Sequence, residues 1–258
     1  MELNLAGRVA IVTGASRGIG SVIASHLQDE GMIVYPLDIA APADAPERFL
    51  RADITSPDEL RLAVDTVLQR DGRIDVLVNN AGINAVGALD QVDLDLAARC
   101  LAVNVTGLLA ACQAVIPAMK RAHHGRIINA ASFAALVPAQ GNGIYAASKA
   151  AVVQLTKVLA GELGPWDITV NAYAPGMIPT AINGFTELPQ AEQDRLLDTL
   201  TLRRWGSADE IADLVSFLAS DRASYITGSL IDASGGKLAT QIPSRAYESF
   251  KAEPGSAV

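Results

Sequence analysis

The chain has 258 residues, of which 50% are hydrophobic and 19% are charged, and its formal net charge is −8 at pH 7. Such a chain can bury a large core, so long disorder is not expected, and without a face-sized basic cluster neither nucleic acid nor an anionic membrane is an expected partner. Aromatic residues make up only 5%, so Ala, Val, Ile and Leu must build the core, which suits buried parallel strands packed on helices.

Short apolar runs alternate along the chain with segments of helical spacing. Strands are expected at Val9–Val12, Ile33–Asp38, Phe49–Ile54, Ile74–Val78, Arg126–Ala131, Ile168–Tyr173 and Ser229–Ala233. Helices are expected at Ser21–Glu30, 57–71, Leu94–Met119, Tyr145–Leu163 and 208–219, with Ser56 and Ser207 as caps. This alternation predicts an α/β fold, a Rossmann-type doubly wound sheet of mostly seven parallel strands with helices on both faces.

No linker divides the chain, so residues 1–258 are expected to form a single domain. Two segments interrupt the alternation, an insertion at 181–206 and a C-terminal tail at 237–258. An insertion that follows the carboxyl end of a strand is where such sheets bind ligands, so residues 181–206 are expected to bind substrate. For the tail, the only assignment is a contact across a subunit interface.

The cysteines, the N-terminus and one basic patch bear on location and partners. Cys100 and Cys112 are held apart in one predicted helix, so we interpret them as buried hydrophobes in a reducing compartment. No signal peptide is expected at 1–8, and the apolar runs are expected to be too short to span a bilayer, which together predict a cytoplasmic protein. The basic patch, interpreted as a helix end and a turn with phosphate binding as the less favoured alternative, is Lys120, Arg121, His123, His124 and Arg126.

A glycine-rich segment joins the first strand to the first helix, and an acid ends the second strand. The segment reads Thr13-Gly14-Ala15-Ser16-Arg17-Gly18-Ile19-Gly20. Its glycines allow a tight turn close to a pyrophosphate, and the helix N-terminus offers unpaired N–H groups to phosphates. Asp38 is spaced to accept hydrogen bonds from an adenosine ribose and to repel the additional phosphate of NADP. This pattern predicts a dinucleotide site, with an ordinary turn and a solvated aspartate as the alternatives.

Tyr145 and Lys149 lie four residues apart on a predicted helix and therefore share one face. An unperturbed tyrosine has a pKa of about 10, and a nearby ammonium favours the phenolate. Tyr145 is therefore predicted to exchange a proton with a substrate oxygen. The alternative is an exposed surface pair.

Six motifs in order resemble the short-chain dehydrogenase/reductase family, in its form of about 250 residues, over Leu5 to Gly236. They are Thr13-Gly14…Gly18-Ile19-Gly20, Asn79-Asn80-Ala81-Gly82, Asn104, Ser132, Tyr145…Lys149 and Pro175-Gly176…Thr180. The resemblance implies that Tyr145 is the acid/base, that Lys149 binds the nicotinamide ribose and lowers the pKa of Tyr145, and that Ser132 stabilises the reacting oxygen. It also implies that Asn104 opens its helix locally and holds a water that relays protons to Lys149.

The same resemblance implies how the chain holds its cofactor. Asp53 and Ile54 would bracket the adenine, the segment 79–82 would lie against the adenosine, and Ile178 and Thr180 would hold the nicotinamide carboxamide. The predicted cofactor-binding residues are Gly14, Ser16, Arg17, Gly18, Ile19, Gly20, Asp38, Asp53, Ile54, Asn80, Ala81, Gly82, Tyr145, Lys149, Pro175, Gly176, Ile178 and Thr180. No metal site is expected.

Two residues bear on cofactor choice. Arg17 is typical of family members that bind NADP, whereas Asp38 repels the 2′-phosphate directly, so NAD is expected and NADP is the less favoured cofactor. Pro36 lies inside the second strand, where it removes a ladder hydrogen bond and is expected to distort the strand end that positions Asp38.

The predicted function is NAD(H)-dependent hydride transfer between a secondary alcohol and its ketone, in a homotetramer paired through the apolar faces of Leu94–Met119 and Tyr145–Leu163. Polar residues among those expected to line the pocket lean towards a sugar or polyol, although these amides could equally brace loops. The lining residues are Asn84, Phe133, Leu136, Gln140, Asn142, Ile182, Phe185 and Leu188. The alternatives are an NADPH-dependent 3-oxoacyl-(acyl-carrier-protein) reductase and a non-catalytic dinucleotide sensor.

Overall fold

The computed structural model describes residues 2–180, 184–237, 239 and 243–251. Seven strands, all paired in parallel, form one sheet in the order β3-β2-β1-β4-β5-β6-β7. The strands are β1 (Val9–Thr13), β2 (Ile33–Asp38), β3 (Leu50–Arg51), β4 (Val76–Asn79), β5 (Gly125–Ala130), β6 (Ile168–Pro175) and β7 (Leu230–Ala233). The predicted fold class is confirmed.

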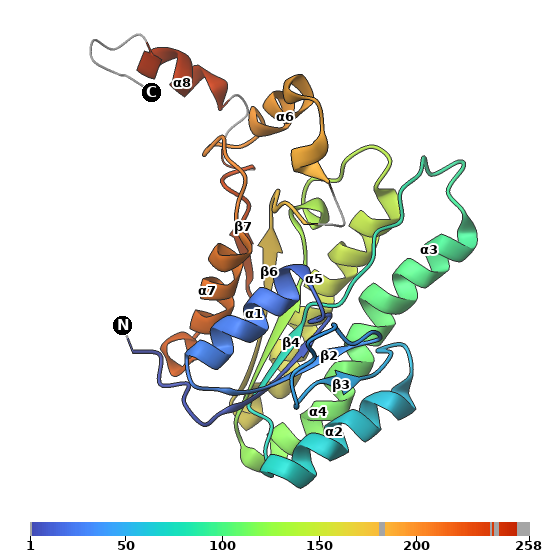
Figure 1. The fold of residues 1–258 in the computed structure, drawn as a ribbon, viewed down its shortest axis with the longest axis vertical. Helices are drawn as coiled ribbons and strands as arrows, with labels where there is room; N and C mark the ends of the chain where they lie inside the picture. Colours follow the sequence, from blue (N-terminus) through green and yellow to red (C-terminus); the bar gives the residue numbers. More distant parts are fainter. Residues whose placement is uncertain (1, 181–183, 238, 240–242, 252–258) are drawn as a thin grey trace.

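Helices cover both faces of this sheet (Figure 1). The α-helices are α1 (Gly18–Asp29), α2 (Pro57–Asp71), α3 (Leu94–Leu101), α4 (Leu108–Ala122), α5 (Gly143–Leu163), α6 (Gln190–Leu197), α7 (Ala208–Ala219) and α8 (Ser244–Lys251). The core on one face joins α1 and α7 to the sheet, and the core on the other joins α2, α4 and α5. Ser56 and Ser207 cap α2 and α7 as predicted.

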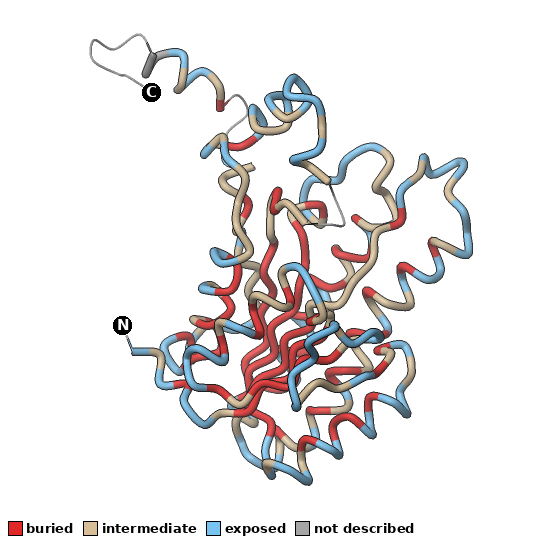
Figure 2. The backbone as a smooth tube through the Cα atoms, in the orientation of Figure 1, coloured by how far each residue is buried: buried red, intermediate tan, exposed pale blue. Residues whose placement is uncertain are grey.

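Successive residues of the central strands enter opposite cores, because side chains alternate along a strand. Val9 and Ile11 of β1 pack with α2 and α4, whereas Ala10 and Val12 pack with α1 and α7. Both faces are therefore covered, and Figure 2 shows the strands as the most buried part of the chain. This double burial explains why the strands read as continuous apolar runs rather than as alternating patterns.

Pro36 does not distort β2, contrary to expectation. The strand keeps its register with β1 through Pro36 to Leu37, and its odd-numbered residues direct their backbone groups towards β1. The nitrogen of Pro36 therefore faces β3, but β3 begins opposite Leu37. Because no ladder partner stands opposite Pro36 on that side, the missing N–H costs the sheet nothing there.

The helix expected at Leu94–Met119 is broken into three parts. Asp93 caps α3, a π-helix occupies Ala102–Gly107, and α4 then continues to Ala122. The resemblance had implied a local opening at Asn104, and the π-helix confirms it. Helices α6 and α8 were not expected, and α1 begins at Gly18, before the expected Ser21.

The stretch Leu94–Ala122 is long and apolar enough, by length and composition alone, to cross a membrane, with a mean hydropathy of 1.7. The expectation that every apolar run is too short is therefore wrong for this stretch. A core helix of a globular domain passes the same test, and α4 packs here on the sheet through Val115 and Met119.

Candidate active site

The glycine segment forms the tight turn expected between β1 and α1. Gly14 and Gly18 have φ angles of 66° and 61°, a backbone region that favours glycine. A Cβ atom on Gly14 would lie only 2.7 Å from the Cα of Ala81, so the turn packs directly on the segment that follows β4. Arg17 at the N-cap of α1 makes no side-chain capping bond, which leaves the first N–H groups of the helix to an anion.

Asp38 ends β2 with its carboxylate against this turn. Its Oδ2 atom accepts hydrogen bonds from the backbone N–H of Ser16 at 3.0 Å and the hydroxyl of Ser16 at 2.7 Å. Its Oδ1 atom accepts from the N–H of Ile39 at 2.8 Å. These bonds fix the carboxylate beside the glycine turn, where the exposed Arg17 also lies.

Asn80 ties together three strands at the carboxyl edge. Its side-chain amide donates to the carbonyls of Thr13 and Gly14, at 3.2 and 3.1 Å, and its Oδ1 accepts from the hydroxyl of Tyr173 at 3.1 Å. The hydroxyl of Thr13 accepts in turn from the N–H groups of Asn80 and Ala81. Sequence reasoning placed Asn80 beside the cofactor and missed that it holds the glycine turn.

Asp53 and Ile54 follow β3, and the two side chains differ in environment. The Oδ1 atom of Asp53 accepts from the N–H and hydroxyl of Thr55, at 2.8 and 2.7 Å. The side chain of Ile54 is buried in the core with α2 and α4. The structure therefore gives Ile54 a packing role, and its predicted contact with adenine stays a prediction.

Asn104 lies in the π-helix and is held by both its amide atoms. Its Oδ1 accepts from the N–H of Ile83 at 2.9 Å, and its Nδ2 donates to the carbonyl of Ile83 at 2.9 Å and to the hydroxyl of Ser148 at 3.0 Å. Ser148 donates to the carbonyl of Tyr145 at 2.6 Å. Ser148 thus links Asn104 to the start of α5, a role that its position beside Lys149 did not reveal.

Ser132, Tyr145 and Lys149 come together where β5 meets α5. Burial raises the pKa of Tyr145, and a hydrogen bond with Ser132 lowers it in part. The Nζ atom of Lys149 donates to the carbonyl of Ala130 at 2.7 Å and lies 5.7 Å from the ring centre of Tyr145. Burial lowers the pKa of Lys149 to about 8. The lowering of the Tyr145 pKa that we expected from Lys149 is not seen, because burial dominates.

The segment Pro175–Thr180 leaves the carboxyl end of β6 and packs on the end of β7. A Cβ atom on Gly176 would lie 2.5 Å from the Cα of Ser234. The side chain of Ile178 is buried and lines a pocket of about 180 Å³ with Leu200 and Ile211. The described structure therefore brings Ile178 to the same edge as the other predicted residues.

The residues expected to contact substrate have mixed surroundings. Asn84 and Asn142 each have a buried side-chain oxygen with no hydrogen-bond partner in the described structure. Phe185 stacks on Trp205 with ring centres 5.5 Å apart. Leu136 and Gln140 are exposed, Phe133 and Leu188 are partly buried, and Ile182 lies outside the described residues.

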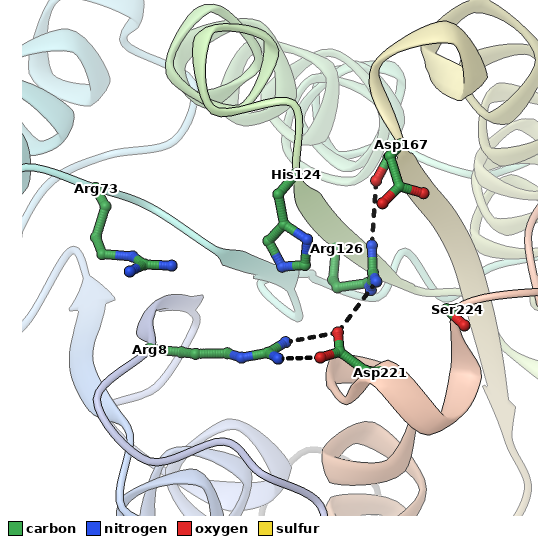
Figure 3. Close-up of a pocket in the computed structure, with 7 residues that line it drawn as sticks. All are labelled: Arg8, Arg73, His124, Arg126, Asp167, Asp221 and Ser224. Carbon is green, nitrogen blue, oxygen red and sulfur yellow. Dashed lines mark hydrogen bonds and ion pairs between the residues drawn. The ribbon is translucent and has the colours of Figure 1, made fainter.

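A second pocket, of about 510 Å³, lies at the amino ends of the strands (Figure 3). Its basic side chains are matched by acids. Arg8 binds both carboxylate oxygens of Asp221, and Arg126 reaches the same carboxylate at 3.3 Å and the carbonyl of Asp167 at 3.2 Å. Arg73 pairs with Asp75 at 2.6 and 2.8 Å. None of the predicted catalytic or cofactor residues lines this pocket.

Neither cysteine is bonded to another, and both are buried, as expected. In the part of the chain that the structure describes, no cluster of three or more His, Cys, Asp or Glu residues is arranged to hold a metal ion.

Comparison with known proteins gives one family and several close relatives. The family described as enoyl-(acyl carrier protein) reductase matches residues 14–237. The 3-oxoacyl-(acyl-carrier-protein) reductase FabG of Thermotoga maritima is 35% identical over 247 residues, which cover 91% of this chain and 99% of that protein.

Two solved structures are similar over almost the whole chain. One is an NAD⁺-bound xylitol dehydrogenase, with 31% identity, a TM-score of 0.85, and coverage of 90% of this chain and 100% of that one. The other is a gluconate 5-dehydrogenase from Burkholderia cenocepacia in complex with NADP and tartrate, with 31% identity, a TM-score of 0.89, and coverage of 93% and 98%.

Proposed function

Because this chain belongs to the short-chain dehydrogenase/reductase family, we propose that it interconverts a secondary alcohol and its ketone with NAD(H). The observation that carries the proposal is the meeting of Asn104, Ser132, Tyr145 and Lys149 at the carboxyl edge, beside the glycine turn. A non-catalytic dinucleotide sensor would need no such set.

The residues present fit a dinucleotide. The uncapped N-terminus of α1 suits a pyrophosphate, and Gly18 has no heavy atom within 4 Å of the position of a Cβ, so the backbone there is open to a ligand. Asp38, Lys149 and Thr180 would hold the ribose and nicotinamide ends. The bound nicotinamide supplies the hydride donor or acceptor.

The protein's own groups supply the proton transfer. Burial raises the pKa of Tyr145 and so favours the protonated phenol, which donates its proton to the carbonyl oxygen during reduction. During oxidation it is the phenolate form of Tyr145 that takes the proton of the alcohol. The hydroxyl of Ser132 stabilises the negative charge that develops on that oxygen. Asn104 and Ser148 hold the first turn of α5 so that Tyr145 stays in position.

The substrate that we propose carries several hydroxyl groups. The unpartnered buried oxygens of Asn84 and Asn142 can each accept a hydrogen bond from a hydroxyl, which favours a sugar or polyol over loop bracing. The similar structures include enzymes named for xylitol and gluconate. Part of the substrate site would come from the insertion, described here for residues 184–206.

The choice of NAD rests on Asp38. A carboxylate held beside the glycine turn by Ser16 would repel the 2′-phosphate of NADP. The alternative, an NADPH-dependent 3-oxoacyl-(acyl-carrier-protein) reductase, is supported by Arg17 and by the similarity to FabG. Turnover of one substrate with NADH and with NADPH separates the two.

A screen of polyols, sugars and simple secondary alcohols with NAD, followed by NADH absorbance, tests the function. We expect oxidation of at least one polyol or sugar, with NAD preferred over NADP. Turnover of 3-oxoacyl thioesters with NADPH, and of no alcohol with NAD, would instead support the alternative.

We also propose a cytoplasmic homotetramer. Leu101 and Val158, on α3 and α5, are exposed apolar side chains on the two helices expected to pair. Light scattering at micromolar concentration should give a tetramer, and a monomer would contradict the proposal.

A further inference from the structure

Lys237 follows β7 at the carboxyl edge of the sheet, and its backbone is fixed. Gly235 and Gly236 precede it with φ angles of 69° and 80°, which turn the chain sharply after the strand. The N–H of Lys237 donates to the hydroxyl of Ser234 at 3.1 Å, and the carbonyl of Gly236 accepts from the hydroxyl of Thr201 at 2.8 Å. The start of the tail is thus tied to its own strand and to the insertion.

The ammonium of Lys237 has fewer partners than it can bind. It donates to the hydroxyl of Thr199 at 2.7 Å and lies 5.0 Å from the ring centre of Phe133. An ammonium offers three donors, and no carboxylate pairs with this one among the residues that the structure describes. Burial accordingly lowers the pKa of Lys237.

The two neighbours of the Lys237 ammonium, Phe133 and Thr199, indicate where it lies in the site. Phe133 directly follows Ser132, the hydroxyl predicted to bind the reacting oxygen. Thr199 belongs to the insertion, the segment expected to bind substrate. The ammonium of Lys237 therefore lies between the residue that follows Ser132 and the insertion.

This position is not suited to the cofactor's phosphates. The glycine turn follows β1, and Asp38 ends β2, whereas β7 forms the opposite margin of the sheet, beyond β6. A cation beside β7 and Phe133 adjoins the predicted substrate side instead.

We propose that Lys237 binds an anionic group of the substrate, a carboxylate, so that the preferred substrates are hydroxy acids. The proposal rests on the proposed function and narrows its substrate class. The hydroxyl to be oxidised would bind Ser132 and Tyr145, while the carboxylate at the other end of the same molecule binds the free N–H groups of Lys237. Because a charge-assisted hydrogen bond is stronger than a neutral one, the cation would select acids over uncharged analogues.

The test compares each acid with its uncharged carboxamide. The panel is 3-hydroxybutyrate and six-carbon sugar acids, each oxidised with NAD by the wild type, Lys237→Met and Lys237→Arg. We expect the wild type to favour acids, and Lys237→Met to lower kcat/KM for acids at least about tenfold while changing that for carboxamides less than about twofold. Lys237→Arg should keep the preference for acids.

Lys120→Met is the matched control, because Lys120 also lies over an aromatic ring, 3.7 Å from the centre of Trp166, but at the far end of α4. This variant should leave the ratio of kcat/KM for acids to kcat/KM for carboxamides unchanged. If Lys237 only ties the tail to Thr199, Lys237→Met should lower kcat/KM for acids and for carboxamides equally. That result overturns the inference. So does a wild type that prefers carboxamides.

Binding gives a second readout that needs no turnover. Calorimetric titration of the enzyme–NADH complex with the same acids should show binding at least about tenfold weaker in Lys237→Met. Equal binding by the two proteins, or none by the wild type, overturns the inference. If the wild type oxidises acids and carboxamides equally well, the inference fails but the proposed function still holds. If Tyr145→Phe keeps its activity, the proposed function itself is contradicted.

Discussion

Both ends of the parallel sheet carry basic side chains, but those that we compare differ in their partners. At the amino edge, the guanidinium groups of Arg8, Arg73 and Arg126 meet the carboxylates of Asp75 and Asp221. At the carboxyl edge, Lys149 and Lys237 meet only carbonyl, hydroxyl and ring partners within the described chain. Burying a cation without a paired carboxylate lowers the stability of the fold. We therefore interpret such cations as groups that bind a ligand.

The comparison also explains why the larger pocket is not the candidate active site. Its charges balance one another, and burial together with the nearby Arg126 lowers the pKa of His124, which favours a neutral ring. Matched charges hold the strand ends together. The carboxyl edge instead keeps open N–H groups, unpartnered amide oxygens and a buried phenol.

The largest effect should follow from Tyr145→Phe, which removes the proton donor but keeps the ring. Turnover should fall at least about 100-fold while NAD binding is unchanged, as measured by steady-state kinetics and cofactor titration. Tyr225→Phe makes the same change at a fully exposed side chain and should have no effect. Near-normal turnover in the Tyr145 variant would show that Tyr145 at the carboxyl edge is not the proton donor.

Arg126→Met tests the amino edge. The side chain is almost fully buried and serves Asp221 and two carbonyls, so its loss should destabilise the fold by about 2 kcal/mol while kcat stays within about twofold. Thermal unfolding and steady-state kinetics measure the two quantities, with the exposed Arg121→Met as control. A large loss of kcat at unchanged stability would show that the amino edge contributes to catalysis rather than to the stability of the fold.

Asp38→Ser tests the adenosine end of the carboxyl edge. The wild type should favour NAD over NADP in kcat/KM by at least about tenfold, or 1.4 kcal/mol, and the variant should lose or reverse that preference because Arg17 is then free to attract the phosphate. Asp53→Ser, at another predicted cofactor residue, should leave the ratio nearly unchanged. A wild-type preference for NADPH would show that Asp38 does not face the ribose.

Local signals were enough for much of the fold. The β-branched runs of β1 and β6 and the Ser caps of α2 and α7 depend on neighbours in sequence, and each appears where it was expected. The tolerance of Pro36 could not be predicted, because it depends on where β3 begins.

In the candidate site, too, some features could be predicted from the sequence and others depend on the fold. The motif residues were identified from the sequence, but the bonds from Asn104 to Ile83 and Ser148 join segments whose contact only the fold creates. The meeting of Lys237 with Phe133 and Thr199 is of the same kind. The pKa of Tyr145, which burial raises, also depends on packing that no spacing rule contains.

The stability of Lys149→Met tests most directly the claim that the carboxyl edge keeps a buried cation at a cost. The folded pKa of Lys149, about 8, lies below its ordinary value, so the cost is fully present below pH 8 and disappears as the pH rises towards the unfolded value of about 10.5. At pH 7 the free energy of unfolding of the variant should therefore exceed that of the wild type by about 1 kcal/mol after the lost bond to Ala130 is counted, which also raises its unfolding temperature. This gain should shrink between pH 8 and 10.5. Its turnover should nevertheless collapse. A variant that is less stable than the wild type at pH 7 would contradict the account, because Lys149 would then stabilise the fold as Arg126 does.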